Sequence, residues 1–213
     1  SLLVLVNHHL MLYSGGQWRD VSSLFGHDPA QGQMNIRVSC LQGGYFLAGN
    51  EGAAWHIVEP LSGKRTPAGL PIIRTRSFVH GLLRGAGGTL WWKHLLMMYT
   101  ELQATSAGAN RKVYGQHGWG QYDMLPAGET LWVVNRAMGG NESGDFPDMF
   151  PGNPDTLYFA PKAGGPSRVV LRASYIRSPR FVDKDTIVYW ADWPVNPAAN
   201  TKTWILRTVT IAG

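Results

Sequence analysis

The sequence is poor in charged residues and contains a single cysteine. Only 15% of its 213 residues are charged, whereas 44% are hydrophobic. The formal net charge is +5, but the basic residues are scattered, and the densest cluster is only Arg74, Arg76 and Arg84. Nucleic-acid binding usually needs a basic stripe, so the sequence argues against it. A lone Cys40 excludes an intrachain disulfide and a cysteine-based zinc site, and its apolar neighbours predict a buried side chain.

Long apolar runs and helical periodicity are also missing. No run reaches the roughly 18 to 20 residues that a membrane helix needs. The opening "SLLVLVNHHLMLY" is interrupted by polar residues, so it is neither a membrane span nor a signal peptide, and the absence of an initial Met suggests a processed or excised chain. Only residues 94–104, "HLLMMYTELQA", could compete as a helix. No N-cap residue precedes them, so we predict a strand there.

Glycine, proline and tryptophan are plentiful, with 26, 13 and 9 residues, and this composition favours short strands joined by turns. Five β-like hexapeptides start at residues 2, 45, 89, 130 and 186: "LLVLVN", "YFLAGN", "TLWWKH", "TLWVVN" and "TIVYWA". Their starts are 43, 44, 41 and 56 residues apart, and the last gap contains an insertion at 139–154, "GGNESGDFPDMFPGNP". A period of about 40 to 45 residues is typical of a four-stranded propeller blade.

Further β-rich runs surround each hexapeptide, so that one repeat forms an antiparallel meander of four strands. We therefore predict an all-β fold, a β-propeller of four-stranded antiparallel blades, rather than a sandwich or barrel, which lacks this period. The prediction is a single domain over 1–213, with repeats at about 1–33, 34–70, 71–116, 117–174 and 175–213. The first repeat lacks a leading strand and the last lacks an outer strand. Two alternatives follow: part of a larger ring, or a five-bladed ring with an irregular closing blade.

The last repeat resembles a known family. Residues 176–213, "IRSPRFVDKDTIVYWAD…TWILRTVTIAG", are similar to the TolB-type, WD40-like (PD40) propeller repeat, in which Ser-Pro leads a strand and an Asp-containing tight turn follows. Residues 155–171 and 53–69 resemble hairpins of the same repeat. The chain departs from the family pattern because only Ser178-Pro179 keeps the Ser-Pro pair, and Lys184 stands where Gly is usual. The resemblance implies a propeller fold and favours a periplasmic or secreted protein, without implying an activity.

The candidate binding residues are aromatic residues in loop-like contexts and one neighbouring acid. They are Trp119, Tyr122 and the acid Asp123 in "QHGWGQYD", Phe146 and Phe150 in the insertion, and Trp193 in "ADWPVNPAAN". Loops on a rigid scaffold often carry binding, and exposed aromatic rings stack on sugars or anchor protein interfaces.

The insertion also contains candidate metal ligands. Glu142, Asp145 and Asp148 offer hard oxygen atoms of the kind that Ca²⁺ prefers, although their spacing does not follow the EF-hand pattern. The alternative is a solvated loop whose aromatic residues fold back on the blade. The sequence predicts no other cofactor; adjacent His8 and His9 could not easily face one metal together.

No G-x-S-x-G elbow, H-E-x-x-H motif or phosphate loop is present. Whether the chain is an enzyme is left open, but the sequence favours a non-catalytic scaffold that binds a protein partner, or another chain completing the propeller, through its rim loops. The alternative is a secreted carbohydrate-active propeller, lectin or glycoside hydrolase, using loop aromatics and carboxylates among Asp20, Asp123 and Glu129. Neither a membrane span nor nucleic-acid binding is predicted.

Overall fold

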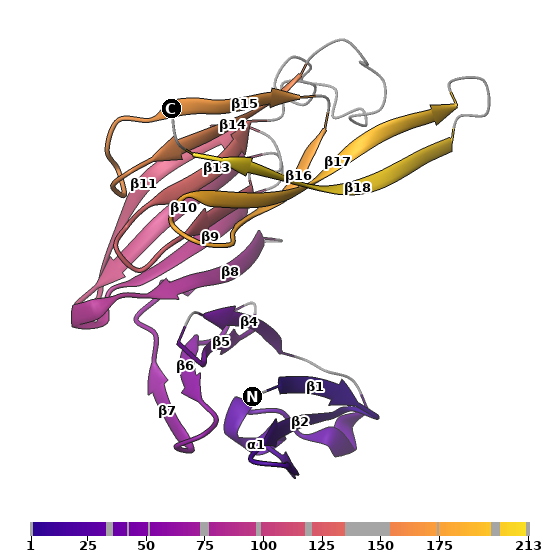
Figure 1. Ribbon diagram of the computed structural model, residues 1–213. Coiled ribbons are helices and arrows are strands. Elements are labelled where there is room, and N and C mark those ends of the chain that lie inside the picture. The colour runs from indigo at the N-terminus through magenta and orange to yellow at the C-terminus, as the bar shows by residue number, and fades with distance from the viewer. Residues whose placement is uncertain are drawn as a thin grey trace. The chain divides into compact units, whose positions relative to one another are not determined.

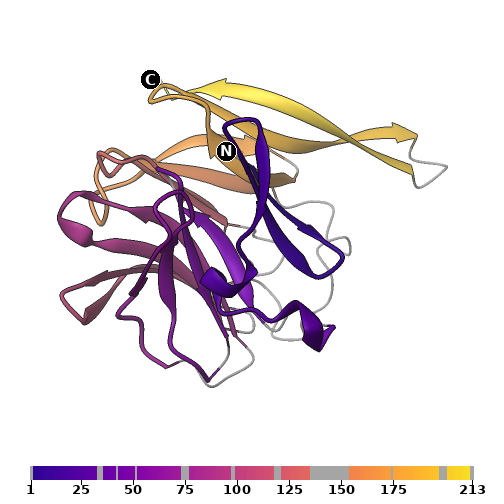
Figure 2. The ribbon, with the colours of Figure 1, turned by 90° about the horizontal axis from the view of Figure 1, so that it is seen from below.

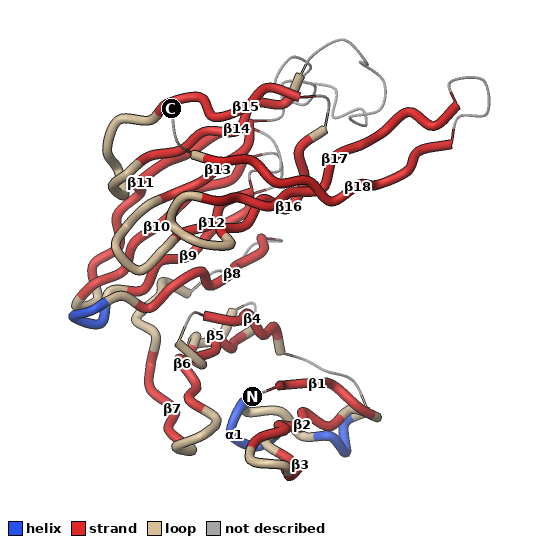
Figure 3. Tube along the Cα trace, in the orientation of Figure 1, coloured by secondary structure: helices blue, strands red, loops and turns tan. Residues whose placement is uncertain are grey.

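The computed structural model describes residues 2–32, 36–41, 43–50, 52–72, 77–96, 99–117, 121–134, 154–173, 175–196 and 201–211. Within these residues the chain forms strands almost throughout, with three short helical turns (Figure 3). The elements are, in chain order, β1 (Leu2–Val6), β2 (His9–Ser14), β3 (Gln17–Asp20), α1 (Ser22–Phe25), η1 (Pro29–Gln31), β4 (Arg37–Leu41), β5 (Tyr45–Gly49), β6 (His56–Glu59), β7 (Lys64–Pro67), β8 (Ser77–Arg84), η2 (Ala86–Gly88), β9 (Leu90–Leu96), β10 (Tyr99–Ser106), β11 (Ala109–His117), β12 (Gln121–Met124), β13 (Thr130–Val134), β14 (Asp155–Ala160), β15 (Arg168–Ala173), β16 (Ile176–Phe181), β17 (Thr186–Asn196) and β18 (Thr201–Thr210).

The strands form five sheets, each a meander of consecutive strands. Sheets β4–β7, β8–β11 and β12–β15 have four strands, and sheets β1–β3 and β16–β18 have three (Figure 1). Every strand pair with a described register is antiparallel. The predicted fold class is therefore confirmed: an all-β chain built from β-propeller blades. That these sheets form a single domain stays a prediction.

The chain divides into two compact units. Unit 1 comprises residues 1–92 and 103–111, and unit 2 comprises residues 93–102 and 112–213. The division passes through the β8–β11 sheet, which contributes residues to both units.

Unit 1 contains two apolar clusters. One joins β2, α1 and the β4–β6 strands around the fully buried Leu12, Phe25 and Val58. The other joins β4–β6 with β8 and β9, and it includes the buried Trp55 and Trp92. The backbone of β8 approaches Leu41 closely because residue 81 is glycine. A Cβ atom at this position would lie 2.5 Å from Cδ2 of Leu41.

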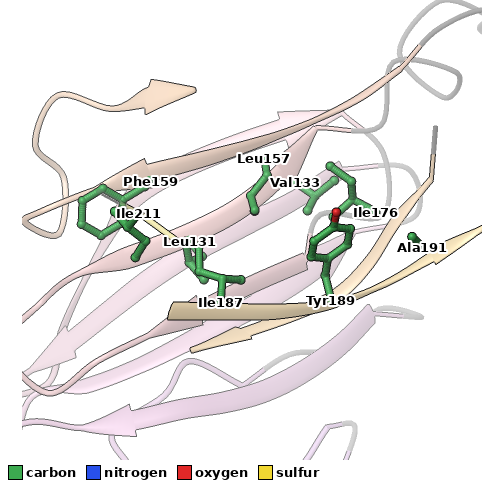
Figure 4. Close-up of a cluster of buried hydrophobic side chains, with 9 residues drawn as sticks. All are labelled: Leu131, Val133, Leu157, Phe159, Ile176, Ile187, Tyr189, Ala191 and Ile211. Atoms are coloured by element: carbon green, nitrogen blue, oxygen red, sulfur yellow. The ribbon is translucent and has the colours of Figure 1, made fainter. Parts of the chain in front are cut away.

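The core of unit 2 lies between the β12–β15 sheet and the β16–β18 sheet. Alternate residues of β13 and β14 face alternate residues of β16 and β17 (Figure 4). The labelled side chains are Leu131, Val133, Leu157, Phe159, Ile176, Ile187, Tyr189, Ala191 and Ile211. Five of them have no exposed surface at all. Each fully buried Leu or Ile contributes about 1.5 to 3 kcal/mol, so this cluster dominates the packing of the two sheets.

The β17–β18 hairpin extends beyond its sheet (Figures 1 and 2). β16 pairs with β17 only as far as Ala191, whereas β17 pairs with β18 up to Asn196. The predicted loop context of Trp193 is therefore wrong, because Trp193 lies in β17 opposite Thr203. Pro194 is tolerated there because the strand has a neighbour on one side only and needs no ladder bond on the other.

Three local features differ from the sequence expectations. Residues 94–96 and 99–104 are strand, as predicted, but they belong to two different strands, β9 and β10. The α1 turn was not predicted; the Oδ1 atom of Asp20 accepts hydrogen bonds from the N and Oγ atoms of Ser22 at its start. Cys40 is exposed rather than buried, because β alternation turns its neighbour Leu41 to the core instead.

Candidate functional site

The structure describes only some of the predicted site residues. Trp119, Glu142, Asp145, Phe146, Asp148 and Phe150 lie outside the described residues, and Trp193 is described only as a backbone position in β17. Their roles in binding or in holding calcium stay predictions. Tyr122 and Asp123 lie in β12, the first strand of the fourth sheet.

Tyr122 lies in the interior of unit 2. Its side chain has no exposed surface, and its hydroxyl donates to the carbonyl oxygen of Thr100 at 3.5 Å. Burial, with the nearby Tyr99 and Glu101, raises the pKa of the phenol well above its usual value, so it stays protonated. A ligand could contact this ring only after local rearrangement.

Asp123 lies beside β16 of the next sheet. Its Oδ2 atom accepts a hydrogen bond of 2.8 Å from the N–H of Phe181, and its Oδ1 atom lies 4.0 Å from Nη1 of Arg180. Burial raises the pKa of this carboxyl, while the Phe181 N–H and the Arg180 guanidinium act in the opposite direction. Asp123 thus has a structural partner on the neighbouring sheet.

The same arrangement recurs along β16. The Oδ2 atom of Asp155, on β14, accepts from the N–H of Ile176 at 2.8 Å and from Nη1 of Arg177 at 2.7 Å. Gln121 Oε1 accepts from the N–H of Ser178, which has a positive φ of 47° at the irregularity in β16. Three side chains of one sheet therefore bind three backbone N–H groups of the next. We name Gln121, Asp123, Asp155 and their partners on β16 the polar seam.

Lys93, on β9, carries the most perturbed amine of the described residues. Burial and the positive Arg180 lower its pKa to about 8, and Asp123 partly opposes this shift. At neutral pH Lys93 and Arg180 are both cationic beside one carboxylate. The arrangement has a net positive charge and could hold an anionic group, although Arg180 is the more accessible cation, with 53% of its side chain exposed.

In unit 1, the β1–β3 sheet leaves one face exposed. Leu10 and Leu12 of β2 point into the core, so the alternate residues point outward. The strand register places eight residues on this outward face: Leu2, Val4, Val6, His9, Met11, Tyr13, Trp18 and Asp20. The exposed fractions are 53% for Leu2, 48% for Val6, 40% for Tyr13 and 52% for Trp18.

The outward face contains an open groove of about 480 Å³. It is lined by Val6, Asn7, His9, Met11 and Trp18. The Trp18 ring packs against the Tyr13 ring, with ring centroids 5.0 Å apart and ring planes tilted by 44°. This contact holds an exposed indole in one position and reduces the entropy that a ligand would have to remove.

A series of hydrogen bonds orients the His9 imidazole at the groove. Nδ1 of His9 lies 2.5 Å from Oδ2 of Asp20, while Oδ1 of Asp20 accepts from Oγ of Ser22 at 2.6 Å. The Ser22 hydroxyl and N–H, and then His9, lower the pKa of Asp20 to about 2. Sequence reasoning missed this pair. The turn at Gly15–Gly16 was the available signal, because a tight hairpin there brings His9, Met11 and Asp20 to one face.

Over its described part, the chain has no group of three His, Cys, Asp or Glu side chains that could hold a metal ion. Of the three carboxylates considered for glycoside hydrolysis, Asp20 binds His9 and Ser22, and Asp123 binds Phe181. The Oε2 atom of the Glu129 carboxylate is buried and has no hydrogen-bond partner among the described residues. No described helix is long and apolar enough to cross a membrane.

The class of fold is thus that of β-propeller blades. No protein-family model matches the sequence, and no curated protein does. Among solved structures the chain is similar to an oligogalacturonate lyase in complex with manganese, with a TM-score of 0.48 and 11% sequence identity. The match covers 82% of this chain and 51% of that one, so the chain spans about half the length of its structural neighbour. A likeness at this level carries no inference about chemistry.

Proposed function

We propose that this protein is a non-catalytic binding scaffold, built from TolB-type propeller blades, that docks a protein partner. The observation that supports this most is the outward face of β1–β3, where Leu2, Val6, Tyr13 and Trp18 are each 40% exposed or more. Large apolar residues gathered on one sheet face are typical of interaction sites. Trp, Tyr and Met are also enriched at the centres of protein interfaces.

The carboxylates of the polar seam support the non-catalytic part of the proposal. Asp123 and Asp155 each accept a backbone N–H of β16 and lie near an arginine. A carboxylate engaged in this way contributes to stability and is poorly placed to transfer protons to a ligand. These two acids therefore have structural partners, whereas the large apolar side chains of the outward face remain open to a ligand.

Variants of matched tryptophans test the proposal. The partner is captured from cells with the whole chain, purified, and titrated calorimetrically against the wild type, Trp18→Ala and Trp190→Ala. Trp190 is a suitable control because it is similarly exposed, at 43%, but lies on β17. We expect Trp18→Ala to weaken binding at least about tenfold, the effect of a hot-spot residue, with no change in melting temperature. Equal effects of the two substitutions would contradict the proposed surface.

The second candidate is a carbohydrate-binding propeller. Trp18 with His9 and Asn7 combines an exposed ring with hydrogen-bonding groups in one open groove, which is the chemistry that sugar rings use. A glycan array with Trp18→Ala, Trp119→Ala and Trp193→Ala decides between the candidates. Specific glycan binding that is lost in one of these variants, without any protein partner, would replace the first proposal by the second.

The insertion carries a separate proposal, calcium binding by Glu142, Asp145 and Asp148. It rests on the ligand types alone. Terbium luminescence with competition by Ca²⁺, compared between the wild type and a Glu142→Gln, Asp145→Asn, Asp148→Asn triple variant, tests it. A calcium site predicts luminescence that the triple variant loses, whereas no luminescence from the wild type would reject the site.

A further inference from the structure

The irregularity in β16 determines where Arg180 lies. Arg177 and Arg180 are three residues apart on β16, but their partners on β17 are only two residues apart, so β16 contains one extra residue here. In a regular strand, side chains return to the same face at every second residue, so Arg180 would face the core as the fully buried Ile176 does. Because of the extra residue, Phe181 packs against the core instead, and the Arg180 side chain is 53% exposed.

The neighbouring sheet holds this irregularity in place. Ser178 has a positive φ of 47°, which is uncommon for a residue with a Cβ atom, and its N–H donates to Oε1 of Gln121. On the other side of Arg180, the N–H of Phe181 donates to Oδ2 of Asp123 at 2.8 Å. Backbone strain of this kind clusters at ligand sites and switches, where the surrounding contacts maintain it. These two hydrogen bonds fix the stretch of backbone that presents Arg180.

The Arg180 guanidinium has donor groups to spare. Its contacts with Oδ1 of Asp123 at 4.0 Å, with the carbonyl oxygen of Tyr122 at 3.4 Å and with that of Pro179 at 3.3 Å all use Nη1. Among the described residues, neither Nε nor Nη2 has a hydrogen bond or an ion pair. Nε and Nη2 donate on the same side of the planar group, so together they can form two parallel hydrogen bonds to one carboxylate or phosphate.

Lys93, on β9, places a second cation near Asp123 and Arg180. Within the described part of the chain its ammonium makes neither a hydrogen bond nor a direct ion pair. Burial and the charge of Arg180 lower its pKa to about 8, and Asp123 opposes this shift only in part. A buried ammonium without a direct partner is unfavourable, and two cations share a single carboxylate here. An anionic group from outside the chain would balance this charge.

We propose that Lys93 and Arg180 form a binding site in unit 2 for a small ligand with an oxyanion group, either a carboxylate or a phosphate. Nε and Nη2 of Arg180 would bind two of its oxygen atoms, and the Lys93 ammonium would supply a second positive charge. Asp123 would position Arg180 without neutralising both cations. The inference goes beyond the proposed protein scaffold and does not depend on it, because no residue of the outward face of β1–β3 takes part.

Anion titrations of the whole chain, labelled with ¹⁵N and followed by NMR at pH 7, test the site. The probes are sodium phosphate and sodium malonate, with sodium chloride at matched ionic strength as the reference for screening. The reporting signals are the Nε–H group of Arg180 and the backbone N–H of Phe181. The variants are Arg180→Gln and Lys93→Met. Their matched controls are Arg172→Gln and Lys162→Met, which change an exposed arginine and an exposed lysine of the same unit.

The expected result is a saturable shift of both signals with phosphate or malonate but not with chloride. Each site variant should weaken binding at least about tenfold, the loss expected from one hydrogen bond between charged groups, and the controls should leave it unchanged. A response to malonate alone supports a carboxylate ligand, a response to phosphate alone supports a phosphate ligand, and a response to both supports a site for either. No response to either anion, the same response to chloride, or equal losses in the controls would overturn the proposal.

Lysine acetylation of the wild type gives a second readout that needs no variant. A saturating concentration of the anion that binds should slow the modification of Lys93 by an acetylating reagent and leave that of Lys162 unchanged, as measured by mass spectrometry of peptides. If a site variant loses its dispersed NMR spectrum and is therefore unfolded, this measurement decides. An unchanged rate at Lys93 would overturn the proposal.

Discussion

Removal of the Asp155 carboxylate should destabilise unit 2 by about 3 kcal/mol. Asp155→Ala leaves the N–H of the fully buried Ile176 without its 2.8 Å acceptor, and an unsatisfied buried group costs about 1 to 3 kcal/mol. It also removes the partner of Arg177. Breaking a fully buried pair costs about 3 to 5 kcal/mol, and the cost is lower here because the Arg177 side chain is 20% exposed. Asp155→Asn keeps an acceptor and should cost about 1 to 2 kcal/mol.

Urea unfolding at pH 7, monitored by circular dichroism, measures these changes. The matched control is Asp185→Ala, which breaks an exposed ion pair with Lys184 and should leave the free energy of unfolding nearly unchanged. Since Arg177 and Asp155 are in contact, a double-mutant cycle with Arg177→Ala should show a coupling above about 0.5 kcal/mol. The reasoning is refuted if Asp155→Ala is no more destabilising than Asp185→Ala.

Three further predictions concern other residues. Gly81→Ala should destabilise unit 1 by about 1 to 3 kcal/mol in the same assay, because the alanine Cβ would lie 2.5 Å from Leu41. An unchanged urea midpoint would show that the packing around residue 81 has room for a methyl group. Asp20 has a pKa lowered to about 2, so its stabilisation is present above pH 4 and is lost as the pH falls through 2. Asp20→Asn should be less stable than the wild type at pH 7, by less than about 1 kcal/mol because the side chain is 43% exposed, and this difference should disappear as the pH falls through 2. The pKa of Lys93 is lowered to about 8 from 10.5, so the folded state binds fewer protons than the unfolded state between these pH values. The free energy of unfolding of the wild type should therefore rise by up to about 3 kcal/mol relative to that of Lys93→Met between pH 7 and pH 10.5. Parallel profiles of unfolding free energy against pH for the two proteins would contradict this.

The sheets could be predicted from sequence because the repeat is visible in local patterns. Hexapeptides such as "TLWVVN" recur at nearly constant spacing, and turn residues lie between them. Strand alternation and turns are local properties, so a single sequence contains them. The context of Trp193 could not be predicted in this way, because Pro194 usually ends a strand and is tolerated only where a hairpin extends past its sheet.

The proposed binding surface and the polar seam were less accessible to sequence reasoning. Asp155 and Ile176 are 21 residues apart, and their contact depends on the packing of two sheets. Tyr122 was chosen for its Gly-rich surroundings, yet the alternation of β12 turns it inward. Trp18 was assigned to a strand and treated as packing, because the sequence does not reveal which sheet face is covered.

Amide hydrogen exchange of the whole chain with its purified protein partner tests the central claim most directly. If the partner docks on the outward face of the first sheet, binding should slow exchange in peptides covering residues 2–20 and leave the β13–β14 core unchanged. Protection confined to other parts of the chain, with residues 2–20 exchanging as in the free protein, would contradict the account.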